Sequence, residues 1–91
     1  MKKTVHVIIS GRVQGVWFRA TTKQEAEKRE IVGWVRNTSD GKVEAVFQGD
    51  DHRVDDMIVW CYEGPSLSHV DKVKVSSLEN KNQFDAFKVR Y

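Results

Sequence analysis

The order of its hydrophobic patterns constrains the fold of this chain more than any other feature of the sequence. Segments in which apolar and polar residues alternate, as in half-buried strands, are interleaved with segments rich in helix-forming residues. Turn signals separate them, most clearly at 38–41 and at Gly64-Pro65. In chain order the patterns predict a strand at 4–10, a helix at 20–30, strands at 31–37 and 42–48, a helix between 50 and 64, a strand at 70–77, a polar turn at 79–82 and a strand at 84–91.

This order, β-α-β-β-α-β with one further short strand, predicts an α+β, ferredoxin-like two-layer sandwich. Two right-handed βαβ-type crossovers place both helices on one face of an antiparallel or mixed sheet and leave the other face open to solvent. The first and third strands should be central neighbours. A chain of 91 residues suits one hydrophobic core, so we expect a single domain spanning residues 1–91.

Two starts are open for the first helix. Thr22 and Glu25 have the spacing of a capping box, in which the first residue lies at the N-cap. Alternatively, Phe18 and Arg19 already lie in the first turn. In either case Glu25 and Arg29 form a favourable i,i+4 pair along the helix.

The charge balance bears on the kind of partner. The net charge is +2, from 15 basic and 13 acidic residues, which is too balanced for the electrostatic footprint of a nucleic-acid-binding protein. A mild basic excess would still attract a small anionic substrate. No apolar run approaches the roughly 20 residues of a membrane span. We therefore expect neither a nucleic acid nor a membrane as a partner.

Cys61 is the single cysteine and excludes an internal disulfide, which is compatible with a reducing compartment. A cytoplasmic location is therefore expected. Cys61 also continues the i, i+3, i+4, i+7 apolar stripe of the second helix, with Val54, Met57 and Ile58. We interpret it as a buried small hydrophobe and not as a nucleophile.

The segment 11–19, Gly-Arg-Val-Gln-Gly-Val-Trp-Phe-Arg, joins the first strand to the first helix. Backbone N–H groups in such a turn can converge on an oxyanion, and the helix dipole favours negative charge there. Arg12 and Arg19 flank the turn, and a guanidinium matches the geometry of phosphate. The alternative is plain turn chemistry at the two glycines. The spacing fits neither a P-loop nor G-x-G-x-x-G.

Asn37 ends the second predicted strand, which can approach the same turn. An amide at that place can accept a hydrogen from a water molecule and orient it for attack. It can instead cap the hairpin turn at 38–41 through its own side chain. The two roles are not exclusive.

Together these segments resemble the acylphosphatase family along the whole chain. The segment 11–19 matches the signature G-x-V-Q-G-V-x-F-R at every fixed position, with Arg12 and Trp17 at the variable ones. The segment Gly-Trp-Val-Arg-Asn-Thr at 33–38, followed by Asp40-Gly41 and Gln48-Gly49, resembles the second signature of the family, and Gly64-Pro65 also fits. The family fold is the same ferredoxin-like sandwich.

The resemblance implies an enzyme that hydrolyses a small acyl phosphate to a carboxylate and inorganic phosphate without a metal or other cofactor. The exposed sheet edge or Cys61 could support association, but nothing in the sequence demands it, and we expect a monomer. It assigns the phosphate to Arg19 and the turn amides, and the positioning of water to Asn37. The water attacks phosphorus and the substrate's own phosphate takes its proton. The turn residues concerned are Arg12, Val13, Gln14, Gly15, Val16, Trp17 and Phe18.

This scheme explains why the segment 11–19 contains no His, Asp or Glu. An acyl phosphate already has a stable leaving group, so fixed donors that position and stabilise charge are sufficient. Trp17 could contact the acyl group, shield the site or simply pack.

Two other classes remain open. One is a non-catalytic module of the same fold that binds phosphate or RNA. The other is a regulatory domain, or a detached part of a larger carbamoyl-transfer enzyme. Turnover of an acyl phosphate distinguishes all of these from an enzyme.

Overall fold

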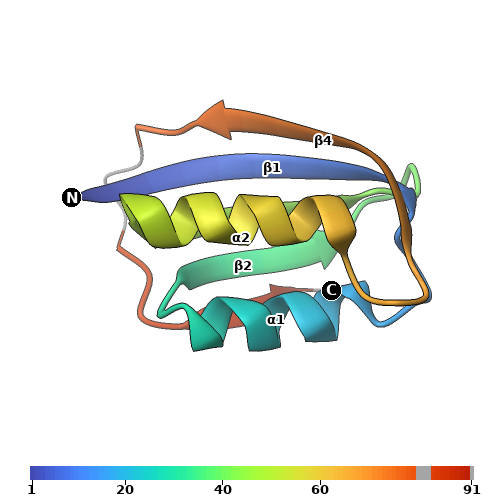
Figure 1. Cartoon of the computed structure of the whole chain (residues 1–91), viewed down its shortest axis with the longest axis horizontal. Helices are drawn as coiled ribbons and strands as arrows, with labels where there is room; N and C mark the ends of the chain where they lie inside the picture. The colour runs from blue at the N-terminus through green and yellow to red at the C-terminus, as the bar shows by residue number, and fades with distance from the viewer. Residues whose placement is uncertain (80–82, 91) are drawn as a thin grey trace.

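The computed structural model describes residues 1–79 and 83–90 and forms two layers, a sheet and a pair of helices that cover one of its faces (Figure 1). The element order is the predicted one. Within the described residues the elements are β1 (Lys2–Arg12), α1 (Phe18–Lys28), β2 (Val32–Asn37), β3 (Val43–Asp50), α2 (Asp51–Glu63), β4 (His69–Ser77) and β5 (Phe87–Arg90).

The five strands lie in the order β4-β1-β3-β2-β5. All neighbours are antiparallel except β2 and β5, which are parallel, so the sheet is mixed. β1 and β3 are central, and the ferredoxin-like α+β sandwich expected from the sequence is confirmed. Because β1 and β2 both run antiparallel to β3, they are parallel to each other and end at the same edge of the sheet.

The core fills the space between the sheet and the helices. Alternate residues of the strands point into it, as the period of two requires. Cys61 is buried there as expected, and burial raises the pKa of its thiol to about 12, which excludes it as a nucleophile at neutral pH. The fully buried apolar side chains of the central strands and of the helices include Val7, Ile9, Val35, Val43, Ala45, Phe47, Ala26, Val54, Met57 and Cys61.

Of the two possible starts of the first helix, the earlier one is correct. α1 begins at Phe18, so the capping-box interpretation of Thr22 and Glu25 is wrong. Thr22 lies within the helix, its side chain is buried, and its hydroxyl donates a hydrogen bond to the Phe18 carbonyl oxygen at 2.7 Å. The pair of Glu25 and Arg29 is confirmed at 2.8 Å, and this hydrogen bond is the main cause that lowers the pKa of Glu25.

β1 extends beyond the predicted 4–10 at both ends, from Lys2 to Arg12, and Gly11 allows the extension at the C-terminal end. The register between β1 and β4 shifts between Ser10 and Gly11, and Gly11 has a φ of 128°. A Cβ atom there would lie 2.1 Å from the carbonyl oxygen of His69. Only glycine permits this close approach of the two strands.

The last strand is shorter than the predicted 84–91 and begins at Phe87. The backbone N–H of Phe84 donates instead to Gln48 Oε1 at 3.2 Å. Ala86 accepts a hydrogen bond from the N–H of Gly33 at 3.1 Å, just before the β5 pairing begins. Residue 91 and residues 80–82 of the predicted turn lie outside the described residues.

Gly33 has no side chain, so β2 can lie close against β3 at this position, and this leads to a stability prediction. A Cβ at Gly33 (φ 139°) would lie 2.0 Å from the carbonyl oxygen of Val46, whereas a Cβ at Gly41 (φ 87°) would meet nothing within 4 Å. Gly41→Ala should therefore lower the free energy of unfolding by about 1–3 kcal/mol through backbone strain alone. Gly33→Ala should cost at least about 3 kcal/mol because a clash with the backbone adds to the strain. Urea unfolding of both variants measures the difference, and equal losses would contradict this account.

Candidate active site

The β1–α1 loop, residues 13–17, is held in one shape by the residue that follows it. Phe18 is buried at the first position of α1 and packs edge-on against Trp60, with ring centroids 5.6 Å apart. Its ring also lies under Gly64, where a Cβ would come within 2.8 Å of it. Gly15 and Trp17 both have left-handed backbone conformations, with φ of 74° and 63°. The loop is thus a sharply bent connection whose C-terminal end is fixed by the buried ring of Phe18.

The N-terminus of α1 is open to an anion. Trp17 is its N-cap and provides no side-chain hydrogen bond to the first turn, and that turn contains no acidic residue. The first N–H groups of a helix have no partner inside the helix, and the helix dipole adds partial positive charge at that end. Arg19 lies in the same first turn and adds a full positive charge.

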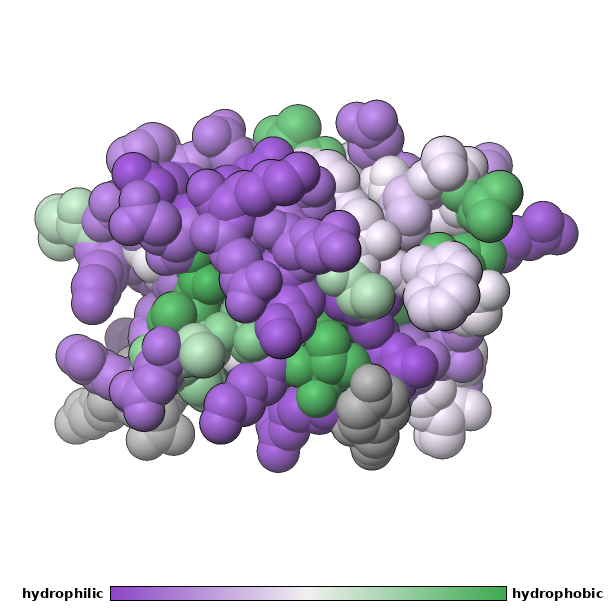
Figure 2. Space-filling view, turned by 90° about the horizontal axis from the view of Figure 1, so that it is seen from below, coloured by the Kyte–Doolittle hydropathy of each residue, from purple (hydrophilic) through white to green (hydrophobic). Residues whose placement is uncertain are grey.

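A cavity of about 340 Å³ lies at this end of the molecule. Its polar lining comes from Gly15, Arg19 and Asn37, so the structure brings Arg19 of α1 and Asn37 of β2 together as the sequence predicted. The apolar lining consists of Val13, Trp17, Phe18, Ala20 and Val89. Figure 2 shows pale and green side chains gathered toward the right-hand end of that view, where the β1–α1 loop and the start of α1 lie, while purple side chains cover much of the rest.

Three residues assigned to the turn do not line this cavity. Arg12 is exposed at the end of β1, where it pairs with His69 of β4. Val16 packs against the hydrophobic core. Gln14 turns its side chain toward the β2–β3 connection.

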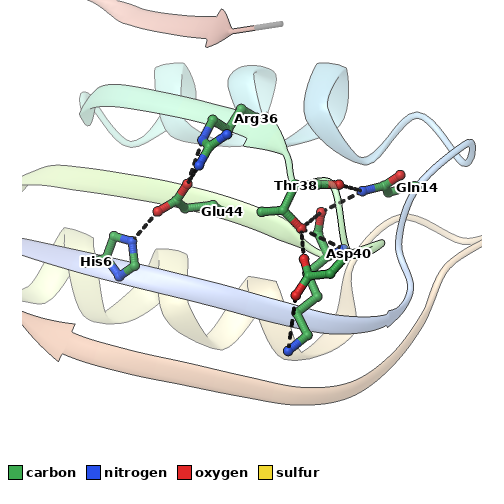
Figure 3. Close-up of polar contacts among 7 residues, drawn as sticks. His6, Gln14, Arg36, Thr38, Asp40 and Glu44 are labelled. Carbon is green, nitrogen blue, oxygen red and sulfur yellow. Dashed lines mark hydrogen bonds and ion pairs between the residues drawn. The ribbon is translucent and has the colours of Figure 1, made fainter.

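Thr38, and not Asn37, closes the β2–β3 turn (Figure 3). Its hydroxyl accepts a hydrogen bond from the Lys42 N–H at 3.0 Å and donates to Asp40, and its own N–H donates to the Lys42 carbonyl oxygen at 2.9 Å. Asn37 Oδ1 is buried and has no hydrogen-bond partner within the described residues. The alternative in which this oxygen caps the turn is therefore wrong.

An unpartnered buried oxygen is unusual, because burying an amide group without a hydrogen bond costs about 1–3 kcal/mol. Asn37 is the last residue of β2, and its backbone is fixed by pairing with Val43. The strand therefore holds an unused acceptor beside the cavity that also contains Arg19.

The Gln14 side chain connects the two halves of the site (Figure 3). Its Nε2 donates to the carbonyl oxygens of Thr38 and Lys42, both at 2.8 Å. The β1–α1 loop is thereby fixed to the turn that follows Asn37. Sequence reasoning gave Gln14 a role only through its backbone, and the spacing contained no signal that its amide would reach residues 24 and 28 positions away.

Trp17 does not pack into the core, since 76% of its surface is exposed. Its carbonyl oxygen accepts hydrogen bonds from the Thr21 N–H at 3.0 Å and the Thr21 hydroxyl at 2.9 Å, which fix its backbone. Val89 also lines the cavity but was not identified from the sequence, because only the pairing of β5 with β2 brings it there.

A second polar chain in Figure 3 crosses the open face of the sheet and contributes nothing to the lining of the cavity. Glu44 accepts from His6 at 2.6 Å and from Arg36 at 2.5 Å. Burial opposes ionisation of Glu44, but these two hydrogen bonds outweigh it and lower its pKa. The chain links β1, β3 and β2 across the sheet.

In the part of the chain that the structure covers, no three His, Cys, Asp or Glu side chains are grouped so that they could hold a metal ion. None of its helices combines the length and the apolar character needed to traverse a bilayer.

Known proteins resemble this chain in sequence and structure. The sequence profile of the family described as Acylphosphatase matches residues 5–89. A relative named Acylphosphatase from Thiobacillus denitrificans is 48% identical over 88 residues, which are 97% of this chain and 97% of the relative. The crystal structure of acylphosphatase from Bacillus subtilis superposes with a TM-score of 0.94 at 32% identity and covers 100% of both chains.

The chain is also similar to one region of a larger protein. It superposes on full-length HypF, crystallised in a phosphate- and nucleotide-bound form, with a TM-score of 0.92 at 29% identity. All of this chain is covered, but only 12% of HypF.

The bridge made by Gln14 can be tested by removing its donors while its length is kept. Gln14→Met leaves the carbonyl oxygens of Thr38 and Lys42 without this donor, so we expect a loss of about 1–3 kcal/mol in the free energy of unfolding. Gln24→Met, at an exposed position of α1, should stay within about 0.5 kcal/mol of the wild type. Urea unfolding of both variants measures this, and a neutral Gln14→Met would show that the bridge does not stabilise the fold.

Proposed function

This chain is a member of the acylphosphatase family, enzymes that hydrolyse acyl phosphates, and from that premise we propose which of its residues carry out the reaction. Arg19 and the N–H groups of the β1–α1 loop and of the first turn of α1 bind the phosphoryl group. Asn37 orients the attacking water. The products are a carboxylate and inorganic phosphate.

The observation that carries this assignment is the unpartnered Oδ1 of Asn37 beside the cavity that contains Arg19. A water molecule entering with the substrate supplies the donor that this oxygen lacks. The hydrogen bond fixes the water near the phosphorus, and positioning of this kind lowers the barrier by converting an encounter into a reaction within one complex.

The charge of the transition state is spread over the phosphoryl oxygens, where fixed donors stabilise it. Arg19 can offer two parallel N–H groups to two oxygens. The uncapped first turn of α1 offers backbone N–H groups to the same anion.

The proton of the attacking water goes to a phosphoryl oxygen of the substrate. No His, Asp or Glu is among the described residues that line the cavity, which supports a reaction without a protein base. The bond between phosphorus and the acyl oxygen breaks, and the carboxylate leaves without needing a proton at neutral pH. We propose that neither a metal nor another cofactor takes part.

The wider setting is part of the same proposal. The small net charge of +2 favours a small anionic substrate over a nucleic acid. The single buried Cys61 fits a reducing, cytoplasmic environment. We also propose that the protein acts as a monomer.

Arg19 gives the first test. The wild type should hydrolyse benzoyl phosphate in the presence of a chelator. Arg19→Ala should lose at least about 10²- to 10³-fold in kcat/KM, roughly the effect of one lost oxyanion donor, because the anchoring charge is gone. For the same reason inorganic phosphate should no longer inhibit this variant. Arg19→Lys should also be impaired, since an ammonium cannot form the bidentate contact. A folded wild type that hydrolyses no acyl phosphate would leave only an anion-binding module, to be titrated with phosphate and RNA.

Asn37 gives a separate test in which activity and stability move apart. Asn37→Ala should lower kcat by about 10²- to 10³-fold while inorganic phosphate still inhibits, because the amide positions water and does not hold phosphate. The free energy of unfolding should not fall by more than about 1 kcal/mol, since Oδ1 makes no hydrogen bond that the change could remove. Steady-state kinetics and urea unfolding measure the two effects. A near-normal kcat would refute the role of Asn37.

A further inference from the structure

The cavity is larger and more apolar than a phosphoryl group requires. Its polar residues, Gly15, Arg19 and Asn37, account for phosphate and water. The remaining lining is hydrocarbon and aromatic, and the volume of about 340 Å³ exceeds what one tetrahedral anion fills. Binding sites of this kind usually combine a few oriented polar groups with apolar walls that take the body of the ligand.

Trp17 is the large exposed side chain of this apolar lining. A bulky residue in a left-handed conformation is rare, and such strain persists where the surrounding structure enforces it, often at functional sites. Here the two hydrogen bonds from Thr21 to the Trp17 carbonyl oxygen hold the backbone in place. The result is a large flat side chain with 76% of its surface in solvent at the rim of the cavity.

Val89 forms part of the same apolar lining from a different element. It lies on β5, is partly buried and packs against the core, so its position is fixed by the pairing of β5 with β2. Trp17 is displayed by the loop and Val89 by the sheet, and both border the cavity that holds Arg19. Val89 offers no hydrogen-bonding group, and Trp17 offers only its indole N–H beside a large apolar ring.

We propose that Trp17 and Val89 form a subsite for the acyl group, and that the enzyme prefers acyl phosphates with a large apolar acyl group over those with a small one. This inference rests on the proposed function. The phosphoryl group is held by Arg19, and the acyl group contacts Trp17 and Val89 in the apolar lining of the same cavity. Covering this face removes apolar surface from water, which benefits benzoyl phosphate and gives acetyl phosphate little.

The test compares benzoyl with acetyl phosphate by the ratio of their kcat/KM values. Trp17→Asn removes the indole while keeping a residue that tolerates the left-handed conformation. We expect the benzoyl-to-acetyl ratio to fall by about tenfold or more, the range that apolar contacts give to substrate discrimination. Trp17→Phe retains an aromatic face and should keep most of the preference. The ratio is informative even if the absolute rates change, because any effect on the phosphate loop is common to both substrates.

A second variant changes the subsite at Val89, so the proposal can still be tested if Trp17→Asn does not fold. Val89→Thr keeps the β-branched shape but places a hydroxyl at the wall, and it should lower the ratio in the same direction. As a control, Val59→Asn also replaces an exposed apolar residue by Asn, at a position of α2 that is 68% exposed. It should leave the benzoyl-to-acetyl ratio unchanged.

The outcomes separate the two proposals. Wild-type protein that hydrolyses neither substrate contradicts the proposed function. Hydrolysis of both substrates with a ratio that Trp17→Asn leaves unaltered overturns the acyl subsite, and if that variant does not fold, an unaltered ratio in Val89→Thr overturns it. Equal losses on both substrates in Trp17→Asn would assign the indole to shielding the phosphoryl group from water and would also overturn the subsite.

Discussion

The burial of Phe18 at the first position of α1 is the interaction on which the site depends. Its ring is held against Trp60 and under Gly64, so α1 cannot begin earlier or later without moving a core aromatic. This fixes where the unpaired N–H groups of the helix lie and forces the chain just before it into left-handed turns at Gly15 and Trp17. An anion site built from backbone groups is only as precise as the element that carries them, and here a packed side chain supplies that precision.

Sheet topology does the rest of the assembly. β1 and β2 are not neighbours, but both pair antiparallel with β3, so they point the same way and end at the same edge. The loop that follows β1 therefore meets Asn37 at the end of β2. Gln14 then connects the loop to the turn after Asn37 through two hydrogen bonds to backbone carbonyls. A rotation of one part relative to the other would break both hydrogen bonds of the Gln14 amide, which opposes such a movement.

The sequence predicted the element order, the topology and the meeting of Arg19 with Asn37, because these follow from periodicity, turn residues and handedness. It did not predict the start of α1. Thr22 and Glu25 satisfy the local capping rule, but burial of Phe18 outweighs it. The role of the Asn37 oxygen was undecidable because it depends on hydrogen bonds that Thr38 makes to Asp40 and Lys42. Val89 reaches the cavity only through a strand pairing with β2, which leaves no trace in local sequence.

The groups that the fold leaves unsatisfied are the ones that the proposed reaction needs. Among the described residues, Trp17 provides no side-chain cap to α1 and no donor reaches Asn37 Oδ1, while the indole of Trp17 is largely in water. Each costs some stability in the free protein, and each would be satisfied by a different part of a bound acyl phosphate: its anion, its attacking water and its acyl group. Such groups are already oriented before the substrate arrives, so little reorganisation is required as charge develops. For a substrate whose leaving group is a stable carboxylate, preorganisation of this kind is sufficient, so the proposed reaction requires no catalytic base.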